Sequence, residues 1–69
     1  MTRKEEKRLK AEYKRRLNEV NDIRLQLRRA YAALDNTTDC EWMEACIYEI
    51  NALKSRYNSA VVNVKNLIS

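Results

Sequence analysis

The clearest pattern in the sequence is a seven-residue repeat of apolar positions in each half of the chain. Apolar residues at spacings of three, four and seven lie on one side of an α-helix. Each half therefore predicts one long amphipathic helix, and only Arg16 and Arg24 interrupt the edges of the first apolar stripe. The repeating positions are Tyr13, Val20, Leu27 and Leu34 in the first half, and Met43, Ile50, Tyr57 and Val64 in the second.

Residues 35–39, between the two repeats, are polar and typical of turns and helix caps, because their side chains bond nearby backbone groups. Thr38 followed by Glu41 fits a capping box, and Asp39 is an alternative N-cap for the second helix. We therefore expect a helix over about 3–34, a turn over 35–38 and a helix over about 39–68. A short connection makes consecutive helices antiparallel neighbours, so the predicted fold is all-α, a coiled-coil-like two-helix hairpin.

Counting outward from the turn predicts how the two stripes pair and how the helix ends match. About six residues at the N-terminus would extend past the end of the second helix. The expected neighbours are Leu27 with Ile47 and Ile50, Leu17 with Leu53 and Tyr57, and Leu9 with Val61 and Val64.

A chain of 69 residues has room for one domain, and a hairpin gives each apolar stripe only one partner. We therefore expect self-association to complete a helical bundle, through the open edges of the stripes or through the reverse side of the second helix. That reverse side is small or uncharged where an exposed helix usually carries Lys and Glu; the alternative is an ordinary solvated face. Its candidate contact residues are Ala45, Tyr48, Ala52, Ser59 and Val62.

The composition argues against catalysis. The chain has no histidine and no glycine, and its pattern shows no nucleophile with a nearby base, no phosphate-binding loop and no converging carboxylate pair. Cys40 and Cys46 are six residues apart on one predicted helix, roughly 9 Å, which exceeds the ~7 Å limit for a disulfide. We expect free thiols that are packed in the core or simply exposed, rather than redox sensors, and no catalytic, cofactor or metal site.

The basic N-terminus is not followed by an apolar stretch, and no window approaches the ~18 apolar residues of a membrane-spanning helix. The expectation is a cytoplasmic protein.

Residues 34–39 (LDNTTD), 43–49 (MEACIYE) and 54–57 (KSRY) resemble the YaaL-like family of short proteins from spore-forming Gram-positive bacteria, over a span from about Leu9 to Leu67. Members are similar in length, in their two-helix layout and in an aspartate-containing turn before a tyrosine-rich second helix. Many carry proline after that aspartate, where this chain has Cys40. The family has no assigned biochemical role, so the resemblance implies the fold and a bacterial source, and brings no site residues.

The basic excess lies entirely at the start of the chain, because residues 1–16 hold eight Lys or Arg against three Glu, while the remainder holds six against seven acidic residues. On the first helix, Glu5, Glu12 and Glu19 follow one shoulder of the stripe, and basic residues follow the other shoulder and the back. The candidate contacts for an anionic partner are Lys7, Arg8, Lys14, Arg15, Arg28 and Arg29.

Three explanations fit this charge pattern. The first is a solvated helix surface supported by pairs such as Glu6 with Lys10. The second is nucleic-acid binding, in which the basic residues contact phosphates. The third, attachment to an anionic membrane, is the weakest because the acidic residues oppose it. The predicted function is therefore a small non-enzymatic module that binds itself or another protein, with RNA or DNA binding as the alternative.

Overall fold

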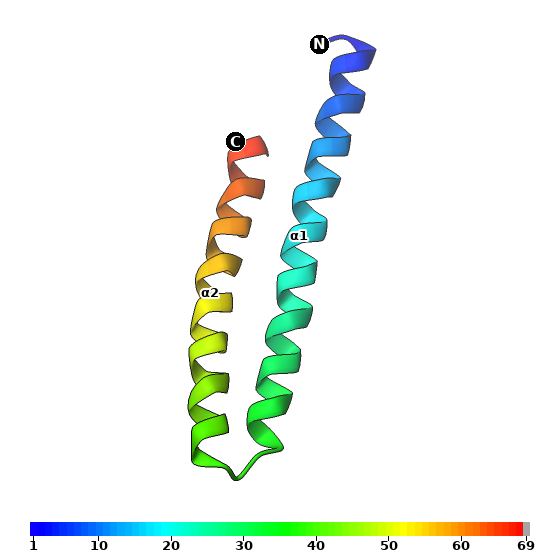
Figure 1. Cartoon of the computed structure of the whole chain (residues 1–69). Coiled ribbons are helices and arrows are strands. Elements are labelled where there is room, and N and C mark those ends of the chain that lie inside the picture. The colour runs from blue at the N-terminus through cyan, green and yellow to red at the C-terminus, as the bar shows by residue number, and fades with distance from the viewer. Residues whose placement is uncertain (69) are drawn as a thin grey trace.

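The computed structural model describes residues 1–68, which form two helices, α1 (Arg3–Asp35) and α2 (Cys40–Ile68). The two helices run antiparallel, side by side, and join at a single turn (Figure 1). No strand occurs within residues 1–68, so the predicted all-α hairpin is confirmed. The molecule is a thin rod, with Cα extents of 57 × 16 × 11 Å.

Side chains cap the beginning of both helices. Thr2 and Glu5 form a reciprocal capping box on α1, with bonds of 3.2 and 3.4 Å. At α2, Asp39 Oδ1 accepts hydrogen bonds from the backbone N–H groups of Glu41 at 3.0 Å and Trp42 at 3.4 Å. Asp39 is thus the N-cap, in place of the Thr38 capping box. With Asp39 as its cap, α2 begins one residue later than the sequence predicted, and α1 also ends one residue later, at Asp35.

The core is a single layer of side chains between the helices. Its members come from both predicted stripes, and α2 contributes slightly more of them. The buried apolar residues are Val20, Ile23, Ala30, Cys46, Ile50, Leu53 and Ala60. Leu27, Leu34, Tyr57, Val61 and Val64 are partly buried against this cluster. Both cysteines carry free thiols, with Cys46 buried and Cys40 exposed.

Two arginine contacts between the helices show their register. Arg16 Nη1 donates a 2.7 Å hydrogen bond to the backbone carbonyl of Asn63, and Arg24 Nη2 donates a 3.3 Å hydrogen bond to the Tyr57 hydroxyl. These arginines interrupt the apolar stripe in the sequence. In the structure they cross to α2 and hold it at defined positions.

This register corrects two of the expected pairings. Leu17 follows Arg16 and so lies about level with Asn63 along the rod, roughly two helical turns from the predicted partners Leu53 and Tyr57. Leu9 lies seven residues before Arg16, beyond the end of α2, so its predicted pairing with residues 61 and 64 is also wrong. An apolar heptad repeat can slide by seven residues and still bury the same stripe, so the pattern alone left the register open.

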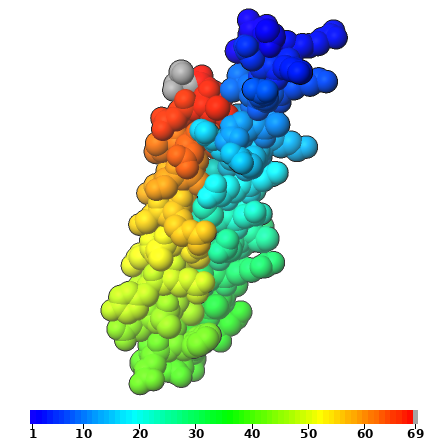
Figure 2. Space-filling view, turned by 45° about the horizontal axis from the view of Figure 1, so that its top comes forward, coloured from blue at the N-terminus to red at the C-terminus, as the bar shows by residue number. Residues whose placement is uncertain are grey.

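The N-terminal end of α1 projects past α2. Arg16 is opposite Asn63, and α2 continues only five residues further to Ile68, so α2 ends about level with residue 11 of α1. Residues 1–11 are all exposed, and the space-filling view shows this end standing clear of the rest (Figure 2). The overhang is longer than the six or so residues expected.

Candidate functional site

The two helices form a flat layer, and one of its two faces is apolar. Tyr31 of α1 and Lys54 of α2 meet on this face, with Lys54 Nζ 5.9 Å from the centroid of the Tyr31 ring. Residues seven apart from these two lie along the same edges of their helices. We call the resulting set the apolar face; it comprises Leu17, Arg24 and Tyr31 of α1 and Ile47, Lys54, Val61 and Ile68 of α2.

Large apolar side chains on the apolar face are only half covered. Tyr31 is 43% exposed, Ile47 47% and Ile68 65%. The two cations on this face do not extend freely into solvent: Arg24 bonds the Tyr57 hydroxyl and Lys54 lies over the Tyr31 ring. Their hydrocarbon stems add to the apolar surface.

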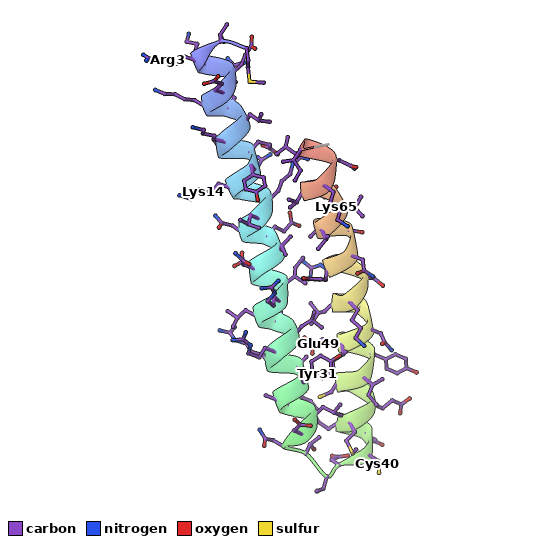
Figure 3. The ribbon with its side chains drawn as sticks, turned by 180° about the vertical axis from the view of Figure 1, so that it is seen from behind. Arg3, Lys14, Tyr31, Cys40, Glu49 and Lys65 are labelled. Atoms are coloured by element: carbon purple, nitrogen blue, oxygen red, sulfur yellow. The ribbon has the colours of Figure 1, made fainter. Side chains whose placement is uncertain are left out.

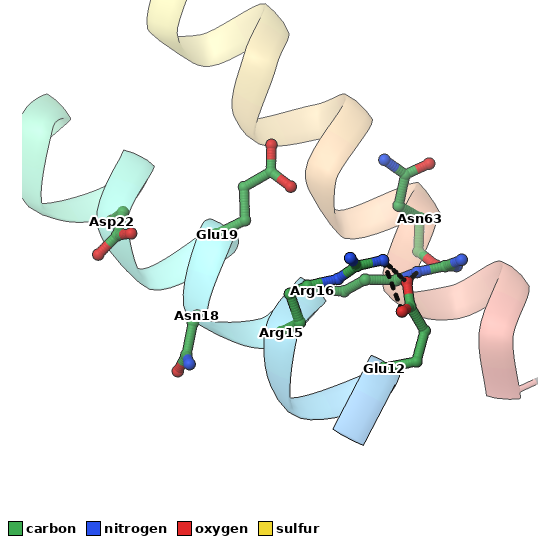
Figure 4. Close-up of a pocket in the computed structure, with 7 residues that line it drawn as sticks. All are labelled: Glu12, Arg15, Arg16, Asn18, Glu19, Asp22 and Asn63. Carbon is green, nitrogen blue, oxygen red and sulfur yellow. Dashed lines mark hydrogen bonds and ion pairs between the residues drawn. The ribbon is translucent and has the colours of Figure 1, made fainter. Parts of the chain in front are cut away.

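The opposite face of the layer is polar. Along it, the row of Glu12, Glu19 and Gln26 on α1 lies next to the row of Glu49, Arg56 and Asn63 on α2, with shallow hollows between them. The largest hollow is shown in Figure 4. It is lined by Glu12, Arg15, Arg16, Asn18, Glu19, Asp22 and Asn63.

Hydrogen bonds join three of the charged groups in this hollow. Arg15 Nη2 donates to both Glu12 carboxylate oxygens at 2.6 Å, and Arg16 Nε donates to Glu12 Oε1 at 2.8 Å (Figure 4). The hydrogen bond from Arg15, then that from Arg16, lowers the pKa of Glu12, and the bond to Glu12 raises the pKa of Arg15. The Glu12 carboxylate therefore links the two arginines.

The six basic residues singled out in the sequence fall into two groups. All six are exposed, and Figure 3 shows Lys14 pointing away from α2. Arg28 and Arg29 lie near the turn, roughly 20 Å along α1 from Lys14. Arg15 differs from the others because its charge is paired with Glu12. The structure therefore places Lys7, Arg8 and Lys14 together, and separates them from Arg28 and Arg29.

The five candidate oligomer contacts lie on the side of α2 turned away from the core. Ala45, Tyr48, Ala52, Ser59 and Val62 are all exposed. The Tyr48 hydroxyl donates a 3.4 Å hydrogen bond to Glu44 on the same helix, and Ser59 lines one of the hollows of the polar face. Ser59 thus lies where this side borders the polar face.

Sequence reasoning named the open edges of the stripes without saying which residues stay exposed. It also missed Trp42, which is exposed near the turn and lies outside both repeats. Trp42 lies seven residues before Glu49, and this spacing could have placed it at the start of the polar row on α2.

The chain matches no protein-family model, no curated protein and no solved structure. The resemblance to the YaaL-like family thus stays a prediction from the residues that carry it. Within residues 1–68, neither helix combines the length and the apolarity needed to cross a bilayer.

Proposed function

We propose that this chain is a small, non-enzymatic interaction module of the cytoplasm that associates with a second copy of itself through the apolar face. The observation that carries the proposal is the difference between the two faces of the layer. Tyr31, Ile47 and Ile68 on one face are 43–65% exposed, while the other face carries mainly Glu, Arg and Asn side chains that suit contact with water, with Trp42 as its exposed aromatic residue near the turn.

The exposed area of the chain supports a partner. Its accessible surface is 5770 Å², whereas a compact monomer of its mass, 8.2 kDa, exposes about 4,500 Å². The excess of roughly 1,200 Å² is comparable to the ~800 Å² that each partner buries in a stable interface. Two hairpins packed face to face would form a four-helix bundle with a two-fold axis, in which each copy presents the same surface to the other.

The hydrogen bonding in the polar hollow supports the non-enzymatic part of the proposal. The acidic and basic groups that a catalytic site would use, Glu12, Arg15 and Arg16, are bonded to one another and to α2. Such a network stabilises the pairing of the helices and engages three groups that a catalytic site would need free.

Sedimentation equilibrium of matched variants tests this proposal. We expect the parent to dimerise at micromolar concentration and Ile47→Glu to shift it to monomer, because the new carboxylate would be desolvated in the interface. Val62→Glu makes a comparable change on the other exposed side of α2 and should leave the dimer intact.

Two results would contradict the proposed contact. If Val62→Glu dissociates the dimer and Ile47→Glu does not, the contact lies on the reverse side of α2, the second of the two places that the sequence indicated. A parent that stays monomeric up to concentrations on the order of 100 μM would reject self-association as a function.

A further inference from the structure

The overhanging end of α1 carries a dense set of cations. We define the basic arm as residues 3–14 of α1. Arg3, Lys7, Lys10 and Lys14 are spaced by four, three and four residues, so they lie on one side of the helix, and Lys4 and Arg8 lie beside them. Figure 3 shows Arg3 beyond the end of α2 and Lys14 directed away from it. We propose that the basic arm binds the phosphate backbone of duplex DNA.

The cations of the basic arm are available to an external anion. The ion pairs within residues 1–68 join Glu12 to Arg15 and Arg16 and involve none of the six arm cations. The nearby Glu5 is engaged in the capping box with Thr2. All six cations are exposed, so binding a phosphate would not require breaking an existing pair.

The dimensions of the arm suit a DNA groove. Arg3 and Lys14 are eleven residues apart, about 16 Å along the helix axis, a length over which duplex DNA presents roughly ten phosphate charges. A helix with its side chains is about 10–12 Å wide, similar to the ~12 Å major groove. Because α2 ends about level with residue 11, it does not lie beside residues 3–10, and Lys14 points away from it.

The same features favour duplex DNA over other polyanions. The deep, narrow major groove of an RNA duplex does not admit a helix. A membrane surface would require a broad apolar side, whereas Leu9 and Tyr13 supply only a narrow one between charged residues. The basic row is mostly lysine, whose point charge contacts phosphate rather than reading base edges, so binding should be independent of DNA sequence.

The proposal goes beyond self-association and does not depend on it. Arg3 and Lys10 continue the row of Leu17 along α1, but they precede it on the overhanging end, beyond the half-exposed apolar residues. A chain that fails to dimerise could therefore still bind DNA. Conversely, a dimer that binds no DNA would refute only the present inference.

Fluorescence anisotropy with a short labelled DNA duplex at about 50 mM salt tests the inference. We expect the double variant Lys7→Glu with Lys14→Glu to lower the affinity for the duplex at least tenfold. The slope of log affinity against log salt concentration should become less steep by about 0.9 for each of the two lost phosphate contacts. Lys7→Gln with Lys14→Gln should lie between this variant and the parent. Because the positions are exposed, circular dichroism should show unchanged helices.

The matched control is Arg28→Glu with Arg29→Glu, which makes the same change in net charge near the turn. This control should bind at least tenfold more tightly than the reversed arm variant, since it leaves the basic arm unchanged. Equal losses in both variants would mean that net charge alone attracts DNA, and would overturn the assignment to the arm. The inference is also overturned if the parent does not bind the duplex at this salt, or binds phosphatidylglycerol vesicles but not DNA.

Discussion

Ile50 lies in the middle of α2 with 5% of its surface exposed, in the cluster that contains Val20, Ile23 and Leu53. We predict that Ile50→Asp unfolds the chain. A buried unpaired carboxylate costs several kcal/mol, and a domain of this size has only roughly 3–10 kcal/mol in total. Circular dichroism should show loss of helix at 25 °C.

The control is Leu25→Asp, because Leu25 is 43% exposed and outside the core cluster. That variant should melt close to the parent. If Ile50→Asp keeps the helical spectrum and the melting curve of the parent, the apolar stripe has been assigned to the wrong side of α2.

Arg16 illustrates what the residue pattern could not predict. In the sequence it is a charge that interrupts an apolar repeat, which suggests a weak edge. In the structure it bonds Glu12 on its own helix and the Asn63 carbonyl on the other. The hydropathy pattern shows only that residue 16 is polar. The group that its guanidinium bonds depends on how the two helices are aligned. For the same reason, the pairing that distinguishes Arg15 from Lys14 required the structure.

At the scale of the helices, substitutions of Asp39 and Thr38 test which of the two residues caps the beginning of α2. We predict that Asp39→Ala lowers the free energy of unfolding by about 1 kcal/mol, because two backbone N–H groups lose their acceptor. Thr38→Ala should change it by no more than a few tenths of a kcal/mol, since Thr38 does not occupy the capping position. Urea titrations of both variants measure the difference. A larger loss for Thr38→Ala would restore the capping box that the sequence suggested.

Both helices and their buried stripes could be predicted from the sequence, because spacing alone determines which residues share a side of a helix. The residues left half exposed could not. Ile47 and Cys46 are both apolar members of the α2 stripe, but Cys46 is buried and Ile47 is not. Their difference depends on where α1 lies across the stripe, a tertiary property that a repeat on one helix does not record.

For the whole molecule, the proposed dimer makes stability depend on concentration. We predict that the melting temperature rises by roughly 5 °C for each tenfold increase in protein concentration, because mass action favours the associated, folded state. Differential scanning calorimetry across the micromolar range measures this shift. The Ile47→Glu variant is the control and should melt at a lower temperature that no longer depends on concentration. A parent with a concentration-independent melting temperature would contradict the prediction.

The single turn at residues 36–39 also has a consequence for how the hairpin forms. Every contact between α1 and α2 closes a loop through this turn, and the loop lengthens with distance from it. The Arg24 to Tyr57 contact spans 33 positions, and the Arg16 to Asn63 contact spans 47. Closing a longer loop costs more chain entropy. We therefore expect the helices to associate first beside the turn, with pairing then extending toward the termini. The basic arm would be the last segment to become ordered on folding and the first to become disordered on unfolding.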